Sequence, residues 1–162
     1  MKEKLGIDIG GVIMDRANDG TDTSFFSANY LQTTEVRGAS EAIHRLVTER
    51  FGEDVFLISK CGVRVATKTL HWLDHRRFYA TTGIKQEHVH FCRERHEKAG
   101  ICEELGITHF VDDRLEVLSH LTMVGTLYLF QSRLDEVHQF RQHLHRVHQV
   151  WSWKEILAKE LP

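Results

Sequence analysis

Short apolar runs of strand length alternate with segments of helical periodicity along this chain, and this alternation constrains the fold more than any other feature. The strand-like runs lie at residues 5–9, 54–59, 88–92, 108–111 and 125–130. The helix-like segments lie at residues 40–51, 63–79, 98–105 and 115–121. Because strands connected through helices pair in parallel, the order predicts a Rossmann-like three-layer α/β fold with a mostly parallel five-stranded sheet.

The end of the chain and its overall length predict how this fold is organised. Ser132-x-x-Asp135 and Ser152-x-x-Glu155 are capping boxes, which are typical of helix starts. The only proline is Pro162, so no proline-rich linker divides the 162 residues. We therefore expect residues 1–162 to form a single domain, with the polar stretch 14–38 as a small flap or lid.

Composition excludes several classes of protein. The formal net charge of -2 argues against a broad nucleic-acid surface, because phosphate backbones attract clustered Lys and Arg. No apolar run approaches the roughly 20 residues of a membrane span, and the N-terminus carries no signal peptide. The three cysteines form no C-x-x-C pair and are expected to be free thiols. We therefore expect a cytoplasmic protein without a membrane partner.

Polar residues gather where the predicted strands end. In an open parallel sheet, ligands bind beyond the carboxyl ends of the strands. The residues there are Asp8, Ser59, Lys60, Lys98, Asp112 and Asp113. Converging carboxylates repel one another unless a cation joins them, and all-oxygen ligands favour Mg²⁺. Lys and Ser complement anionic oxygens, and the N–H groups of Gly10 and Gly11 can approach a phosphate because neither residue has a Cβ.

These residues form four motifs that resemble those of the haloacid dehalogenase (HAD) superfamily. Asp8-Ile-Gly-Gly-Val-Ile after an apolar strand is similar to the first motif, and Ile58-Ser59 is similar to the second. Lys98 is similar to the third motif, and Val111-Asp112-Asp113-Arg114 to the fourth. Their order and spacing match over residues 5 to 114, and this implies a HAD-like hydrolase with a minimal cap.

The resemblance implies a role for each acid. Asp8 would be the nucleophile that forms an aspartyl-phosphate, and it would also bind Mg²⁺ together with the carbonyl of Gly10. Asp113 would be the direct carboxylate ligand of the fourth motif, supported by Asp112. Such a site works by positioning charge around a transferring phosphoryl group.

The resemblance assigns the phosphoryl oxygens to Ser59 and Lys98. The stretch around Lys98 is mostly charged, and charge runs are usually solvated faces. Arg93, Arg95 and Lys85 therefore remain alternatives for the cation that holds the phosphate.

One position departs from the family pattern. Phosphatases of the superfamily usually carry a second Asp two residues after the nucleophile, where it protonates the leaving oxygen, and this chain has Gly10 there. General acid catalysis typically contributes roughly 100- to 10,000-fold. Asp15 is the nearest spare acid, and Asp19 and Asp22 lie further along the flap. We expect turnover to be weakened most on poor leaving groups.

Three functions are consistent with this sequence. The first is a Mg²⁺-dependent phosphatase acting on a phosphorylated small molecule, such as a nucleotide or another phosphomonoester, since Asp-Asp-Arg is similar to the fourth motif of deoxyribonucleotidases. The second is a catalytically impaired domain that binds a phosphorylated ligand or a protein partner without turnover. The third is carbon–halogen or carbon–phosphorus cleavage, and the paired acids argue against its metal-free dehalogenase branch.

Overall fold

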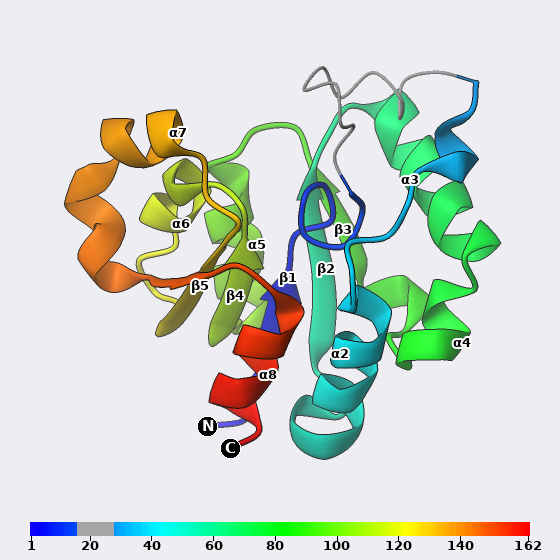
Figure 1. Ribbon diagram of the computed structural model, residues 1–162, viewed down its shortest axis with the longest axis horizontal. Helices are drawn as coiled ribbons and strands as arrows, with labels where there is room; N and C mark the ends of the chain where they lie inside the picture. Colours follow the sequence, from blue (N-terminus) through cyan, green and yellow to red (C-terminus); the bar gives the residue numbers. More distant parts are fainter. Residues whose placement is uncertain (16–27) are drawn as a thin grey trace.

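The structure is a computed structural model that describes residues 1–15 and 28–162, and its centre is a parallel sheet (Figure 1). The strands are β1 (Leu5–Ile7), β2 (Val55–Lys60), β3 (Val89–Cys92), β4 (His109–Asp112), β5 (Thr126–Phe130) and β6 (His148–Val150). They are ordered β3-β2-β1-β4-β5-β6, and every neighbouring pair is parallel. The predicted Rossmann-like α/β fold is confirmed.

The predicted number of strands was one too small. The sheet ends in β6, a three-residue edge strand whose first two residues, His148 and Gln149, are exposed. A run this short and polar has no apolar alternation, so it carries no local signal of a strand. Strand β6 forms because the edge of β5 offers backbone hydrogen-bond partners. Only the tertiary structure brings residues 148–150 beside that edge.

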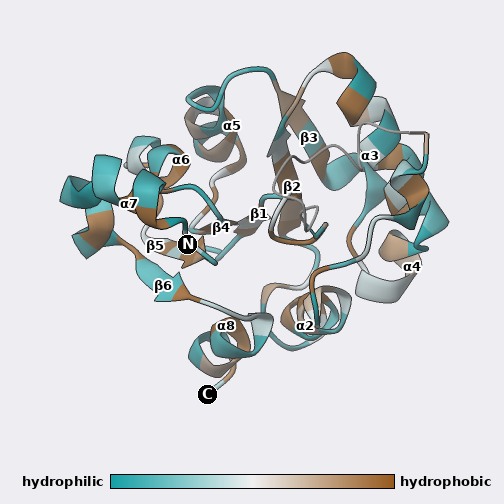
Figure 2. Ribbon diagram, turned by 45° about the horizontal axis from the view of Figure 1, so that its top comes forward, coloured by the Kyte–Doolittle hydropathy of each residue, from teal (hydrophilic) through white to brown (hydrophobic). Residues whose placement is uncertain are grey.

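Helices cover both faces of the sheet (Figure 2). They are α2 (Ala39–Leu46), α3 (Val63–His75), α4 (Phe78–Thr82), α5 (Glu97–Leu105), α6 (Leu115–His120), α7 (Leu134–Gln139) and α8 (Trp153–Glu160). Shorter turns are η1 (Tyr30–Gln32), η2 (Val47–Phe51), η3 (Gln86–His88) and η4 (Arg141–Arg146). Helices α2, α3, α4 and α8 contribute to one apolar cluster, and α5 and α6 contribute to the other.

The helix predicted over residues 63–79 is divided in two. Helix α3 ends at His75, and Arg77 takes the left-handed conformation (φ 53°) before α4 begins at Phe78. A non-glycine residue in this conformation is uncommon and interrupts a helix. Because of this break, α4 is oriented so that the Phe78 side chain is buried in the apolar cluster to which α2, α3 and α8 also contribute.

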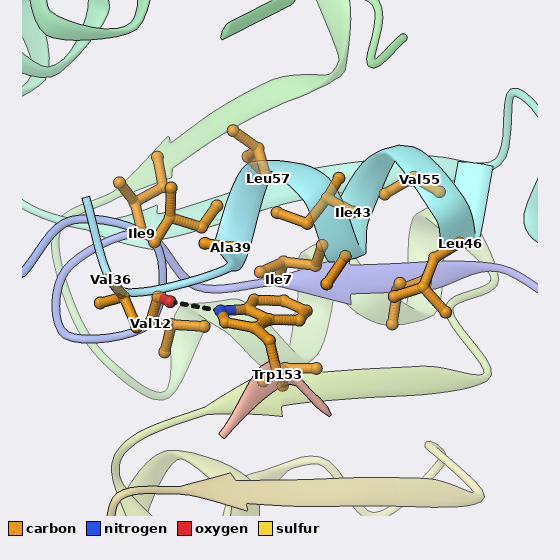
Figure 3. Packing of buried hydrophobic residues seen from close by; sticks show 14 of the residues in the cluster. Ile7, Ile9, Val12, Val36, Ala39, Ile43, Leu46, Val55, Leu57 and Trp153 are labelled. Atoms are coloured by element: carbon orange, nitrogen blue, oxygen red, sulfur yellow. Dashed lines mark hydrogen bonds between the residues drawn. The ribbon is translucent and has the colours of Figure 1, made fainter. Parts of the chain in front are cut away.

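Residues of the central strands alternate between the two cores, as a pleated strand requires. Val55 and Leu57 of β2 belong to the cluster under α2 and α8, whereas Phe56 and Ile58 belong to the cluster under α5 and α6. In the first cluster, Trp153 of α8 lies against the sheet (Figure 3). The buried indole Nε1 of Trp153 donates to the carbonyl oxygen of Val12 at 2.9 Å. Helix α8 is thereby bonded to the turn that follows β1.

One of the two predicted capping boxes is present. The Ser152 side chain accepts a hydrogen bond from the backbone N–H of Glu155 at the start of α8, as predicted. Ser132 does not cap α7, because the helix begins later and its N-cap is Arg133. In α7, Glu136 instead accepts hydrogen bonds from backbone N–H groups at the start of α6.

The flap predicted for residues 14–38 lies partly outside the described residues, which omit 16–27. At its two ends, Met14 and Val36 are buried in the apolar cluster under α2 and α8. The Val36 N–H donates to the carbonyl of Ile13 at 2.7 Å. Among the described helices, none combines the length and apolar character that crossing a bilayer requires.

Candidate active site at the carboxyl edge of the sheet

Three carboxylates meet where β1 and β4 end. Asp8 directly follows β1, Asp112 is the last residue of β4, and Asp113 comes next. Since β1 and β4 are neighbours in register, the acids leave the sheet side by side, and one oxygen of each lies within 4.8 Å of the others. All three are buried, with exposed fractions of 7% for Asp8, 0% for Asp112 and 5% for Asp113. In the described part of the chain this is the only cluster of potential metal-binding side chains.

Lys98 is the cation that contacts these acids. Its side chain is 2% exposed and extends from the first turn of α5. Its Nζ donates to Asp8 Oδ1 at 2.9 Å and to Asp112 Oδ2 at 2.8 Å. The other oxygen of Asp112 accepts from the backbone N–H of Arg114 at 3.0 Å. Both oxygens of Asp112 are therefore engaged by protein donors.

Burial and mutual repulsion shape the electrostatics. Burial raises the pKa of Asp112, and the Asp8 carboxylate raises it further, while Lys98 opposes both. Burial alone would lower the pKa of Lys98, but the carboxylates of Asp112 and Asp8 outweigh it and raise the pKa above its usual value. The lysine is therefore held as an ammonium ion, and the acids favour a further positive charge.

The charges of this cluster fit a divalent cation. Three buried carboxylates lie within 4.8 Å of one another, and Lys98 bonds to two of them, Asp8 and Asp112. Carboxylate oxygens are the ligands that hard cations such as Mg²⁺ prefer, and buried charges are tolerated only when compensated. The side chains of Asp8, Asp112 and Asp113 could therefore hold a divalent cation.

The acids form the floor of a cavity of about 360 Å³, within the usual size range for small-molecule sites. Ser59, which is buried, and Lys60, which is exposed, line it from the end of β2. Gly10 and Gly11 line it from the turn after β1. The structure thus brings every predicted site residue to one cavity.

The two glycines differ in what they can offer a ligand. Gly11 has φ 78°, a conformation that favours glycine, and its N–H donates to the carbonyl of Met14 at 2.8 Å. That N–H is therefore already used within the turn. Gly10 is exposed, and a Cβ placed on it would meet nothing within 4 Å. The missing acid at position 10 consequently leaves open space in the cavity.

The other cations considered for holding the phosphate either lie outside the cavity or form an ion pair with an acid of the protein. Lys85 contacts Glu53 at 2.9 Å, and neither residue lines the cavity. Arg93 is exposed and does not line the cavity either. Arg95 does line it, but its Nη1 lies 2.6 Å from Glu116 Oε2. Lys98 is therefore the candidate cation that touches the acids.

One cationic residue of the cavity, Arg133, is not indicated by any sequence motif. Arg133 lines the cavity from the segment after β5, where no motif points to it. The pairing of β4 with β5 brings the segment after β5 beside the acids, and only this pairing could have indicated that Arg133 lies at the cavity. Asp15 also lines the cavity, and its Oδ2 accepts from Thr34 at 3.4 Å. Asp19 and Asp22 lie outside the described residues.

Comparison with known proteins identifies the fold. A HAD family hydrolase from Deinococcus radiodurans R1, solved with bound phosphate and sodium, superposes with a TM-score of 0.64 at 13% identity, covering 97% of this chain and 94% of that one. A protein described as a HAD family hydrolase from Streptomyces avermitilis MA-4680 has a TM-score of 0.47 at 16% identity, with 90% and 79% covered. No family model and no curated protein matches the sequence. The chain therefore has the fold of the HAD hydrolases.

Proposed function

We propose that this protein is a phosphatase-type hydrolase of the HAD superfamily that uses Mg²⁺ and acts on a nucleotide or another small phosphomonoester. The observation that carries the proposal is the cluster of Asp8, Asp112 and Asp113 around Lys98 at the base of the cavity. The phosphate in the structurally similar hydrolase from Deinococcus radiodurans R1 is consistent with such a site. We also propose a cytoplasmic location, in agreement with the three free cysteines.

In this proposal Asp8 is the nucleophile. A carboxylate oxygen of Asp8 forms a bond to phosphorus, the bond from phosphorus to the substrate oxygen breaks, and that oxygen takes up a proton. Water then hydrolyses the aspartyl-phosphate and regenerates the carboxylate. Lys98 orients Asp8 through its hydrogen bond to Oδ1, and Ser59 is placed to donate to a phosphoryl oxygen. A bound Mg²⁺ would neutralise charge on the phosphoryl oxygens.

The residue at position 10 predicts how this activity depends on the leaving group. Because Gly10 cannot donate a proton, the acid that usually protonates the leaving oxygen is missing, and we expect solvent to supply this proton. An activated ester such as p-nitrophenyl phosphate hardly needs this proton, whereas an alkyl phosphate does. We therefore expect turnover of p-nitrophenyl phosphate with Mg²⁺ and much slower turnover of alkyl phosphates.

The test uses two variants. Asp8→Asn should reduce p-nitrophenyl phosphate turnover by at least about 1,000-fold, as expected for loss of a nucleophile. Gly10→Asp should accelerate alkyl phosphate hydrolysis by about 100-fold, because the position has room for a carboxylate and an acid contributes this much. Turnover that survives in Asp8→Asn would contradict the mechanism.

The second candidate function is a domain that binds a phosphorylated ligand or a protein partner without turnover. The glycine at position 10 favours it, since the rest of the cluster can hold an anion without a general acid. No turnover of p-nitrophenyl phosphate by a protein that Mg²⁺ still stabilises would support this function over the first.

A further inference from the structure

Cationic side chains other than Lys98 also line the cavity. They are Lys60 at the end of β2, and Arg95, Arg114 and Arg133 in the segments that follow β3, β4 and β5. Arg114 directly follows the acids on β4, and Arg133 lies three residues beyond the neighbouring strand β5. These two guanidinium groups therefore flank the acid cluster on the side of β4 and β5.

Among the described residues, neither of these two guanidinium groups has a protein partner. Arg114 and Arg133 have no ion pair or side-chain hydrogen bond with any residue in the described ranges 1–15 and 28–162. The nearby acids are already engaged: Glu116 pairs with Arg95, and Glu136 accepts from the backbone N–H groups of Leu115 and Glu116. The start of α6 is thus capped from within, and the two guanidinium groups can donate to a ligand, as can the exposed Lys60 at the end of β2.

The cavity also has apolar side chains in its lining. Val65 of α3 and Met14 of the turn after β1 are among them, so an uncharged part of a ligand can contact them. Guanidinium groups bind carboxylates and phosphates through paired, charge-assisted hydrogen bonds. A ligand that satisfies the whole cavity therefore has one phosphoryl group at the acids and Lys98, a short body, and a second anionic group at the arginines.

We propose that the preferred substrate is a small phosphomonoester bearing a second anionic group, a carboxylate or another phosphate, which Arg114 and Arg133 bind. The proposal rests on the phosphatase-type function given above and specifies its substrate class. The cavity of about 360 Å³ suits a compact molecule of this kind.

Three ligands with one carbon frame test the proposal: glycerol 3-phosphate, 3-phosphoglycerate and glycerol 1,3-bisphosphate. Their affinities are measured by calorimetry with the full chain and Mg²⁺, and phosphate release is followed in parallel. The two doubly anionic ligands should bind about 10- to 100-fold more tightly than glycerol 3-phosphate, the gain expected of charge-assisted hydrogen bonds. Whichever of the two binds more tightly identifies the second group as a carboxylate or a phosphate.

Two variants assign the effect to the arginines. Arg133→Ala changes an exposed side chain and should keep the fold, and Arg114→Ala is the second test. In each, the affinity ratio between doubly and singly anionic ligands should fall towards one. The matched control is Arg141→Ala, which lies outside the cavity and should retain the wild-type ratio.

The outcomes separate this proposal from the proposed function. Turnover of p-nitrophenyl phosphate together with equal affinity for all three ligands would overturn the second-anion site and leave the phosphatase intact. A preference that persists in both arginine variants would also overturn it. Absence of both turnover and binding of any of the three ligands would overturn the proposed function as well.

Discussion

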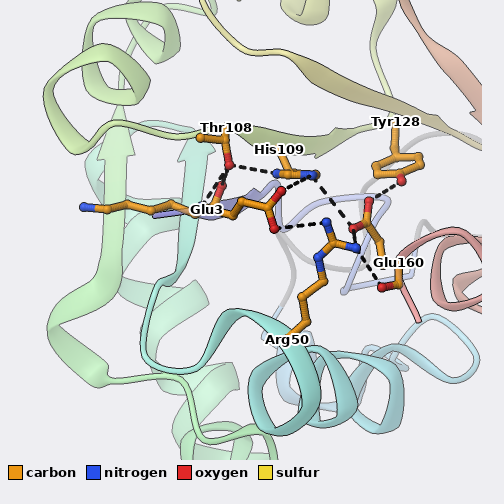
Figure 4. Close-up of polar contacts among 7 residues, drawn as sticks. Glu3, Arg50, Thr108, His109, Tyr128 and Glu160 are labelled. Carbon is orange, nitrogen blue, oxygen red and sulfur yellow. Dashed lines mark hydrogen bonds and ion pairs between the residues drawn. The ribbon is translucent and has the colours of Figure 1, made fainter. Parts of the chain in front are cut away.

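The two ends of the sheet both bury carboxylates, but they differ in how many acids are brought together. At the amino end, Glu160 is 5% exposed, accepts a hydrogen bond from the Tyr128 hydroxyl and lies 2.7 Å from Arg50 Nη1 (Figure 4). Arg50 also bonds to Glu3 at 3.0 Å. At the carboxyl end, three buried acids lie together, and the ammonium of Lys98 bonds to two of them, Asp8 and Asp112.

This difference distinguishes a single paired carboxylate from a cluster of three. Buried charges are stable when each is paired and hydrogen-bonded, as at Glu160. At Asp8, Asp112 and Asp113, three like charges lie within 4.8 Å of one another, so we expect a cation to act at this end of the sheet. Helix α8 reaches both ends, because Trp153 at its start bonds to Val12 and Glu160 is its last residue.

The largest expected effect is a response to Mg²⁺ confined to the carboxyl end. At a concentration about 100 times its dissociation constant, Mg²⁺ should stabilise the protein by about 2.7 kcal/mol, measured as a rise in Tm. Asp113→Asn should abolish most of this rise, whereas Glu160→Gln should retain it. An equal response in both variants would show that the two ends do not differ in this way.

The next effect concerns the amino end. Glu160→Gln removes the charge that faces Arg50 and should lower the free energy of unfolding by about 2 kcal/mol in urea titrations. Glu3→Gln is the matched control, because the Glu3 side chain is 51% exposed, and exposed pairs contribute about 0 to 1 kcal/mol. Equal losses in the two variants would contradict the structural role given to Glu160.

A smaller effect is expected where α8 meets the turn after β1. Trp153→Phe keeps an aromatic ring but leaves the Val12 carbonyl without its donor, and it should destabilise the protein by about 1 kcal/mol. Because this turn follows Asp8, p-nitrophenyl phosphate turnover should also decrease. Trp151→Phe is the control, since Trp151 is 56% exposed and should change neither quantity.

The smallest effect is a pH dependence at the amino end. Burial lowers the pKa of His109, although Glu160 and Glu3 oppose this and Arg50 adds to it. The folded protein thus holds His109 neutral, and the associated stability is present above a pH of about 6.5 and lost as the pH falls through the lowered pKa. His109→Gln should flatten the fall in unfolding free energy between about pH 7 and 5, by less than about 1.4 kcal/mol per unit. Replacing the exposed His44 by Gln should leave the slope unchanged.

Much of the fold could be predicted because its signals are local. The buried runs of β1, β2, β4 and β5 and the periodicity of α2 lie within single segments. The predictions were wrong where local signals are weak or misleading, at the polar edge strand β6 and at the helix break at Arg77. Gly6 shows the same limit, because a Cβ there would lie 2.5 Å from the Phe110 ring, and nothing near it in sequence indicates this.

The sequence by itself determined which chemical groups lie at the strand ends: acids at the ends of β1 and β4, a hydroxyl near the end of β2, and glycine in place of a second acid at position 10. Only the tertiary structure decided that Lys98 bridges Asp8 and Asp112, that Arg95 is paired with Glu116, and that Arg133 joins the cavity. The physical reason is that strand ends are fixed by local periodicity, whereas ion pairs between residues as distant as 8 and 98 depend on how the strands are ordered in the sheet.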